Sequence, residues 1–205
     1  MDISVSSDFP GGWERPERWP VVESTDLHRD DWVMALRRDR IQQPGAPTET
    51  PFGRLVLEHP GAVVVLAVDA EDRVLVLSQY RHPAGRRFLE LPAGLIDEAG
   101  EEPLDVARRE LREEAAYAAA RWRPLLTAYS SPGISAERIH YFLARDLTSV
   151  DRGDFVLAHE EADMSSGWVP VEDLIDAALD GRAQDAPMAV AVLAYDALRR
   201  RGRLD

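Results

Sequence analysis

The alternation of apolar and polar positions predicts strands through most of the first two thirds of the chain. Residues 21–24 and 32–42 come close to strict alternation, and the polar residues 25–31 between them read as a turn, so a small antiparallel sheet is expected there. Three further strands are predicted at 53–59, 62–69 and 73–81. The strand at 62–69 is so uniformly apolar that both of its faces should be covered, which predicts a sheet with helices on both sides.

The pattern changes after an acidic stretch at 91–119. Strands are predicted at 122–131, 137–147 and 168–170, and helices at 171–181 and 186–201. The first twenty residues are rich in Pro, Gly and Trp and indicate an irregular arm. We therefore predict three parts: an arm at 1–20, an N-terminal β-sheet region that serves dimerisation at 21–58, and the main domain at 59–205.

Composition excludes several classes of function. A chain of 205 residues with a formal charge of −13 repels phosphate backbones, so nucleic acid is not an expected partner. The absence of cysteine excludes disulfides, a thiolate nucleophile and a Cys-type zinc site, and all 24 basic residues are Arg, which excludes lysine-based chemistry. No secretory signal pattern or long apolar run is present, so no membrane association and a cytoplasmic location are expected.

The acidic stretch predicts a helix that begins near Pro103. Its apolar stripe, formed by Leu104, Ala107, Leu111 and Ala115, should pack on the sheet. Three carboxylates, Glu110, Glu113 and Glu114, then emerge together beside that stripe. Like charges at these spacings destabilise a helix by roughly 0.2–0.5 kcal/mol per pair unless a cation neutralises them. Mg²⁺ or Mn²⁺ suits such hard oxygen ligands, although runs of this kind are also common on solvated helix faces.

The spacing of the motif resembles the Nudix box of the Nudix hydrolases. Seven residues separate Glu101 from the run Arg109-Glu110-Leu111-Arg112-Glu113-Glu114, and Gly94 lies in a turn before Glu101. The resemblance implies an α/β Nudix-type α/β/α sandwich with a mixed sheet, in addition to the small N-terminal antiparallel sheet. It further implies that Glu110 and Glu114 are the principal metal ligands, that Glu113 and the Ala93 carbonyl assist, and that Arg109 pairs with Glu101 to orient the helix.

Two positions depart from the usual box. Six residues rather than five separate Gly94 from Glu101, and we expect the extra residue to bulge outwards. Ala116 stands where the box usually has Gly. A left-handed conformation costs Ala roughly 1 kcal/mol, so the helix is expected to continue past this position.

Outside the box, "SQYRHPAGRRFLELPAGLID" and "SSPGISAERIHYFLA" resemble the ADP-ribose pyrophosphatase branch, its actinobacterial members in particular. This implies substrate contacts from Arg81, Glu58, Ser131 and Gly133, and support of the metal site by Glu90. It also implies a homodimer with an exchanged N-terminal sheet, in which Trp32 helps shape the adenine pocket of the partner. Read without the family, Arg81 is a solvated strand end, the Ser131 turn an ordinary turn and Trp32 a core residue.

The branch also places a catalytic base in a mobile acidic loop. Glu161 is the residue chosen here, with Glu160 as the alternative. The predicted reaction is the metal-dependent hydrolysis of ADP-ribose to AMP and ribose 5-phosphate. Two other functions stay open: hydrolysis of another nucleoside diphosphate derivative, such as a nucleotide sugar or dinucleotide, and a sensor that binds ADP-ribose without cleaving it.

Overall fold

The computed structural model describes residue 14 and residues 16–46, 50–98, 100–153, 155–156 and 162–204. The elements follow one another as β1 (Val21–His28), β2 (Ala35–Ile41), β3 (Phe52–Glu58), β4 (Ala62–Ala67), β5 (Arg73–Arg81), η1 (His82–Ala84), β6 (Arg86–Glu90), β7 (Ala93–Leu95), α1 (Pro103–Ala115), β8 (Tyr117–Tyr129), β9 (Arg138–Ser149), β10 (Ser165–Pro170), α2 (Val171–Leu179) and α3 (Ala186–Arg200). Most of the predicted arm, residues 1–20, lies outside the described residues.

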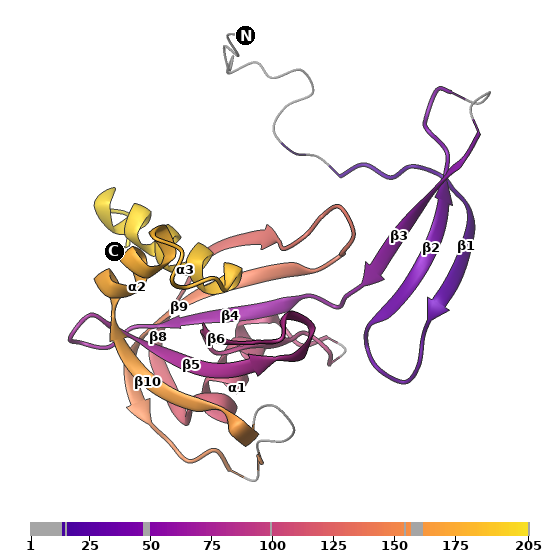
Figure 1. The fold of residues 1–205 in the computed structure, drawn as a ribbon. Coiled ribbons are helices and arrows are strands. Elements are labelled where there is room, and N and C mark those ends of the chain that lie inside the picture. The colour runs from indigo at the N-terminus through magenta and orange to yellow at the C-terminus, as the bar shows by residue number, and fades with distance from the viewer. Residues whose placement is uncertain are drawn as a thin grey trace.

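The first three strands form an antiparallel sheet in the order β1-β2-β3, which stands to one side of the rest of the molecule (Figure 1). The predicted turn at 25–31 is wrong in its first half, because β1 continues through His28 and pairs with β2 as far as Leu36. All eight residues of β1 are exposed. The strand is therefore a bare edge, whereas β2 is paired on both sides.

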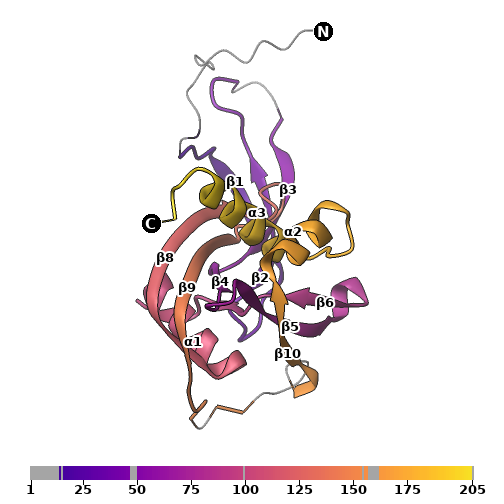
Figure 2. The ribbon, with the colours of Figure 1, turned by 90° about the vertical axis from the view of Figure 1, so that its left-hand side faces the viewer.

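Two further sheets form the body of the molecule. One has the order β10-β5-β6 and the other β7-β4-β9-β8. The second is mixed, because β4 runs parallel to β9 and antiparallel to β7. Helix α1 lies on one side of these sheets and helices α2 and α3 lie on the other (Figures 1 and 2). The predicted α/β/α sandwich is confirmed.

Strand β4 is buried on both faces, as the sequence predicts. Val64 and Leu66 pack in a core beneath α2 and α3, while Val63 and Val65 pack in a second core beneath α1. Successive side chains of a β-strand point to opposite faces of the sheet, so this one apolar run contributes to both cores. This central position holds the first residue of β4, Ala62, in place, and the candidate site lies beside that residue.

The end of α1 differs from the prediction. The helix stops at Ala115, and Ala116 adopts a left-handed conformation with φ 59° and ψ 40°. Its N–H donates to the carbonyl of Arg112, 2.9 Å away, and β8 begins at the next residue, Tyr117. The continued helix was wrong because the turn starts a thirteen-residue strand, whose pairing with β9 offsets roughly 1 kcal/mol of left-handed strain.

No helix in the described part of the chain combines the length and apolar character that crossing a membrane requires.

Candidate active site

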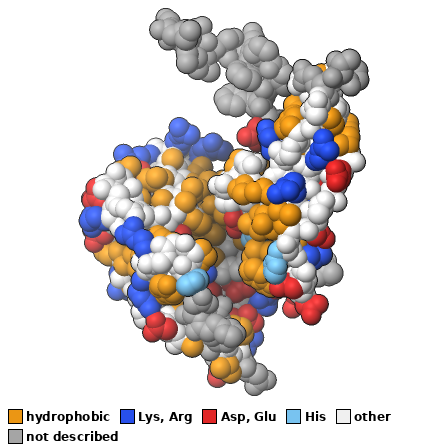
Figure 3. All heavy atoms as spheres, turned by 45° about the vertical axis from the view of Figure 1, so that its right-hand side comes forward, with side chains coloured by type: hydrophobic (Ala, Val, Ile, Leu, Met, Phe, Trp, Pro, Cys, Tyr) orange, Lys and Arg blue, Asp and Glu red, His pale blue; other side chains and the backbone are white. Residues whose placement is uncertain are grey.

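A cavity of about 710 Å³ lies between the N-terminal sheet and the body of the molecule. Trp32 and Met34 line it from the side of the N-terminal sheet, and residues of β4, β5, β6, β7 and α1 line it from the body. The hollow between these two parts is visible in Figure 3. A volume of this size suits a nucleotide-sized ligand.

The carboxylates of α1 face this cavity. Glu110 and Glu114 are buried, with residue exposures of 8% and 6%, and Glu113 is partly exposed. Helical spacing puts positions 110 and 114 one turn apart on the same face. Burial of two carboxylates is costly unless partners or a cation compensate their charge. Their position therefore favours a functional site over a solvated helix face.

Arg109 supplies part of that compensation. Its guanidinium lies 2.7 Å from Glu110 Oε1 and 3.3 Å from Glu113 Oε2, and 3.4 Å from Glu101 Oε2. The predicted ion pair between Arg109 and Glu101 is therefore present. Burial by itself lowers the pKa of Arg109, but the hydrogen bond to Glu101 and the surrounding carboxylates raise it above its ordinary value.

The turn before α1 is shaped to receive two of these carboxylates. A Cβ atom on Gly94 would lie 2.1 Å from the Glu110 carboxylate, so only glycine leaves room for that side chain. The backbone N–H of Ala93 donates to Glu114 Oε2 at 2.8 Å. The loop that follows, which is one residue longer than in the usual motif, is exposed at residues 97, 98 and 100.

This donor set fits a hard divalent cation. Glu110, Glu113 and Glu114 offer carboxylate oxygens at the wall of one cavity, and Ala93 lies in the facing strand. Among the described residues, no three acidic or histidine side chains converge closely enough to form a metal cage as they stand. Arg109 and the Ala93 N–H hold the carboxylates in this arrangement, so they would exchange these partners to ligate a metal.

Arg81 and Glu90 form a second charged pair in the cavity. The Nη2 atom of Arg81 lies 2.6 Å from Glu90 Oε2, and the Glu90 side chain is only 8% exposed. The hydrogen bond to Glu90 raises the pKa of Arg81 above its ordinary value. Both residues were predicted from the sequence to belong to the site, and the structure brings them to the cavity wall.

Asp185 is a cavity residue that the sequence analysis missed. It caps α3 by accepting a hydrogen bond from the Met188 N–H at 2.8 Å, and it also lines the cavity. Burial raises the pKa of the Asp185 carboxyl to about 6, and the negative charge of Glu90 acts in the same direction. The sequence Asp-Ala-Pro predicts a helix cap at this position but gives no sign that the cap faces the cavity.

His59 and Glu137 were also missed. The His59 side chain is 6% exposed, and its Nε2 lies 3.5 Å from Glu137 Oε1. Its Nδ1 accepts a hydrogen bond from the Gly61 N–H, so the proton of the neutral ring belongs on Nε2. Burial lowers the pKa of His59, which keeps the ring neutral near pH 7. Both residues line the cavity, and only their proximity in the fold relates them.

Of the remaining predicted residues, one lines the cavity and three do not. Trp32, 62% exposed, lines the cavity of its own chain. Ser131 and Gly133 do not line it: the Ser131 carbonyl accepts hydrogen bonds within its turn, and Gly133 has open space around it. Glu58 does not line the cavity either, and its carboxylate pairs with Arg29 at 2.8 Å and with Arg37.

The two candidates for the catalytic base, Glu160 and Glu161, lie outside the described residues. Of the described residues on either side of their segment, Phe155 lines the cavity and Asp163 pairs with Arg87 of β6.

Comparison with known proteins adds relatives to this geometry. The chain is 41% identical over 178 residues to the ADP-ribose pyrophosphatase of Mycobacterium tuberculosis, a match that covers 87% of this chain and 83% of the relative. It is 37% identical over 158 residues to the ADP-ribose pyrophosphatase of Bacillus subtilis, covering 74% and 80%. It is also 32% identical over 164 residues to the methanol dehydrogenase activator of Bacillus methanolicus, covering 78% and 83%.

A solved structure agrees in fold. The crystal structure of an ADP compounds hydrolase superposes with a TM-score of 0.73, at 17% identity, over 94% of this chain and 100% of the other. Residues 58–191 match the NUDIX domain. The match spans α1 with its carboxylates, the Gly94 turn and the central strand β4, and we conclude that the chain belongs to the Nudix family.

Proposed function

We propose that this protein hydrolyses the pyrophosphate bond of ADP-ribose, giving AMP and ribose 5-phosphate, with Mg²⁺ as the metal. The observation that carries the proposal is the pair of buried carboxylates, Glu110 and Glu114, at the wall of a nucleotide-sized cavity that also contains Arg81 and Trp32. The names of the two pyrophosphatase relatives support the choice of substrate.

In this proposal Glu110 and Glu114 hold the metal, with help from Glu113 and the Ala93 carbonyl. When bound, Mg²⁺ supplies neutralisation of the pyrophosphate charge and makes water more acidic. Arg109 keeps its pair with Glu101 and so maintains the orientation of α1. Gly94 keeps the space into which the Glu110 carboxylate extends.

The substrate contacts follow from charge and shape. Arg81 donates to a phosphate oxygen, and Glu90 fixes the direction of its guanidinium. Trp32 stacks on the adenine ring, either in its own chain or, as the resemblance implies, in a partner subunit. Glu161 accepts the proton of the attacking water as the new phosphorus–oxygen bond forms and the bridging oxygen leaves with one product.

A second function of the same class is the hydrolysis of a nucleotide sugar or dinucleotide, because the α1 carboxylates act only on the pyrophosphate. A sensor without catalysis is disfavoured by the complete set of Arg109 and the three glutamates.

Assembly and location belong to the same proposal. The exposed β1 edge and the apolar residues of the N-terminal sheet support a homodimer formed through that sheet. A cytoplasmic location remains the expectation from the sequence.

The test is a substrate panel of ADP-ribose, a nucleotide sugar and a dinucleotide, assayed with Mg²⁺ and with Mn²⁺ and followed by chromatography of the products. ADP-ribose should have the highest kcat/KM and should give AMP and ribose 5-phosphate. Glu114→Gln should lower kcat by at least about two orders of magnitude in a folded protein, and Glu71→Gln in the exposed β4–β5 turn should not. Equal kcat/KM for all substrates would refute the substrate assignment, and an unaltered kcat in Glu114→Gln would refute the metal site.

The base is tested separately. Glu161→Gln should lower kcat roughly 10²–10⁴-fold and leave KM and Mg²⁺ affinity nearly unchanged, whereas Glu160→Gln should be mild. Recovery of activity at high Mg²⁺ would instead make Glu161 a metal ligand. The reverse order of severity would assign the base to Glu160.

A further inference from the structure

A second cavity, of about 880 Å³, lies between β8, β9 and the C-terminal half of α3. Its lining contains four arginines and one acidic residue, Asp72, in a chain whose formal charge is −13. We call it the arginine pocket and define its cationic wall as Arg121, Arg123, Arg145 and Arg199. Guanidinium groups gathered in one cavity are suited to binding an anion.

The backbone register brings these arginines onto one face. Arg121 of β8 lies directly opposite Arg145 of β9, and Arg123 lies opposite Leu143. Leu143 packs in the core beneath α3, so its face of the sheet is the one that α3 covers. Like charges directly opposite each other in a sheet destabilise it. A bound anion would offset this repulsion together with Asp146, which pairs with Arg121, and Asp72, which pairs with Arg145.

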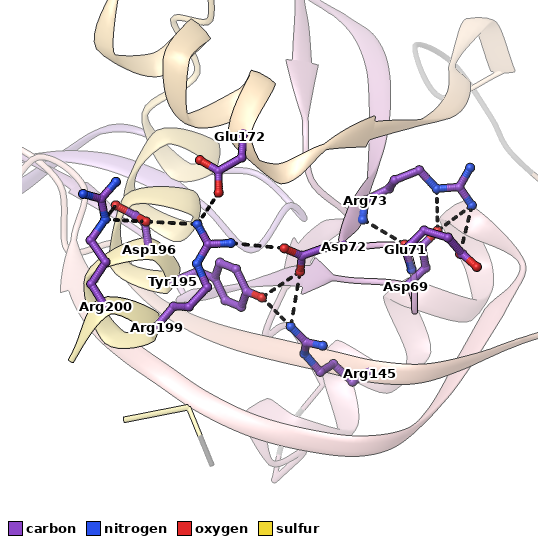
Figure 4. Close-up of polar contacts among 10 residues, drawn as sticks. All are labelled: Asp69, Glu71, Asp72, Arg73, Arg145, Glu172, Tyr195, Asp196, Arg199 and Arg200. Atoms are coloured by element: carbon purple, nitrogen blue, oxygen red, sulfur yellow. Dashed lines mark hydrogen bonds and ion pairs between the residues drawn. The ribbon is translucent and has the colours of Figure 1, made fainter. Parts of the chain in front are cut away.

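Arg121, Arg145 and Arg199 form ion pairs with carboxylates of the same chain. Arg145 and Arg199 share Asp72, at 3.5 and 3.1 Å, and Tyr195 donates to the same carboxylate at 3.0 Å (Figure 4). Arg199 also pairs with Asp196 at 3.3 Å and with Glu172, and Arg121 pairs with Asp146. The side chains of Asp72 and Asp146 are 45% and 53% exposed. Ion pairs this exposed contribute at most about 1 kcal/mol, so an incoming phosphate can replace them.

The pocket also has an aromatic and apolar wall. The guanidinium groups of Arg145 and Arg199 each lie 5.7 Å from the centre of the Tyr195 ring, which holds them in place. Trp122, Leu143 and Leu204 also line the pocket. Rigid guanidinium groups recognise phosphate by paired hydrogen bonds, and the volume admits a ligand as large as a mononucleotide.

We propose that the arginine pocket binds a small phosphate dianion, either the free ion or a phosphate monoester. The site is distinct from the candidate active site, although two elements reach both. Strand β9 contributes Ile139 to the active-site cavity and Arg145 to the arginine pocket, and α3 contributes Pro187 and Arg199 respectively. Pro187 and Arg199 are twelve positions apart in this helix, which corresponds to about 18 Å along the axis.

The experiment is a calorimetric titration of the full chain with inorganic phosphate, ribose 5-phosphate and AMP, in EDTA and at low ionic strength. Arg121→Gln and Arg123→Gln should each weaken binding at least about tenfold, the loss expected for one charge-assisted hydrogen bond. The control is Arg182→Gln, which removes the same charge from an exposed arginine paired with Asp180 outside both cavities. It should leave the affinity unchanged.

Hydrogen–deuterium exchange of the wild-type protein gives an independent readout, so a variant that fails to fold does not block the test. The ligand should protect residues 120–123 and 199–204. Equal affinity for the three probes identifies the free ion as sufficient, and tighter binding of either ester identifies a monoester. Absence of binding, equal losses in Arg182→Gln and Arg121→Gln, or protection confined to residues 88–97 and 110–114 would each overturn the proposal.

Discussion

At the scale of single residues, Gly94 and Glu110 show how an absent side chain determines the position of a charged one. The Glu110 carboxylate occupies the space that a Cβ on Gly94 would need, with an atom only 2.1 Å from that position. The Glu110 side chain ends between this turn and Arg109, which lies 2.7 Å from its Oε1. A glycine at the turn is therefore part of the geometry of the carboxylates, although it carries no functional group.

We predict that Gly94→Ala displaces the Glu110 carboxylate and weakens metal binding without unfolding the protein. The new methyl meets the end of a flexible side chain, so the backbone need not move, but the carboxylate must. The Mg²⁺ concentration for half-maximal activity should rise at least about tenfold, as expected for one weakened ligand. Gly167→Ala is the matched control, because a Cβ at Gly167 meets open space. An unchanged Mg²⁺ dependence in Gly94→Ala would contradict this account.

A second residue-scale prediction concerns Asp185 and pH. Its pKa is about 6 in the folded protein and about 3.8 without the fold, so the folded state binds the proton more tightly. The charged carboxylate therefore costs no stability below about pH 4, and its cost grows as the pH rises to about 6 and then stays constant. Asp185→Asn removes the charge and keeps the helix cap, since Asn caps as well as Asp.

Thermal unfolding of Asp185→Asn and wild type at pH 4 and pH 8 measures this effect. At pH 8 the variant should be more stable by about 1 kcal/mol, after discounting for partial exposure, or about 2–4 °C in Tm. At pH 4 the two proteins should unfold at the same temperature. A gain of equal size at both pH values would show that the charge of Asp185 is not its cause.

At the scale of elements, the end of α1 is the point where local preference and tertiary structure disagree. Ala116 has φ 59°, a region that L-residues other than glycine rarely adopt. The helix nevertheless ends there, and the Val150 N–H donates to the Ala116 carbonyl at 2.9 Å. Pairing of β8 with β9 thus overrides the preference of alanine for a continued helix.

We predict that Ala116→Gly stabilises the protein by about 0.5–1 kcal/mol, or about 2–4 °C in Tm, because glycine adopts the left-handed conformation without strain. The same change at Ala197, an exposed position inside α3, should destabilise the protein by about 0.5–1 kcal/mol. Differential scanning calorimetry of the two variants gives this comparison. The interpretation fails if both substitutions destabilise equally.

Most of the elements were predictable, and the misses have physical reasons. Strand β5 at Arg73–Arg81 has the predicted bounds, since its apolar run ends at charged residues on both sides. Strand β7 was missed because three residues are too few to show a period. Strand β6, with the sequence RRFLE, shows no alternation that separates it from a loop.

At the scale of the whole molecule, the candidate site combines a local motif with contacts that only the fold creates. The α1 carboxylates and Arg109 were predictable, since they lie within six residues of one another. His59 and Glu137 are 78 positions apart in sequence and meet only because β9 lies beside β4. Asp185 joins them from a helix cap. Residues assembled through long-range pairing leave no periodic signal in a single sequence.

The N-terminal sheet also poses a question at this scale. Of the thirteen large hydrophobic residues that are exposed in the described part of the chain, seven lie from Trp19 to Leu55, and β1 is a fully exposed edge strand. A three-stranded sheet of this size has little apolar surface to bury by itself, and an exposed apolar edge favours pairing with another chain. A second copy of this chain, paired through the same sheet, would bury both features at once.

We therefore predict a homodimer whose formation depends on β1. Light scattering coupled to size-exclusion chromatography should give about twice the chain mass for the wild type at micromolar concentration.

Val22→Glu places a charge on the exposed apolar part of β1 and should shift the protein to monomers, because burying an unpaired carboxylate in an interface costs several kcal/mol. Val190→Glu, an equivalent change at an exposed position of α3, should leave the dimer intact. If Trp32 also serves the site of a partner, the Val22→Glu monomer should show a higher KM for ADP-ribose. Its Mg²⁺ dependence should equal that of the wild type, since the carboxylates proposed to bind the metal all come from α1 of one chain. A wild-type protein that is monomeric and fully active at assay concentration contradicts both the dimer and the shared site.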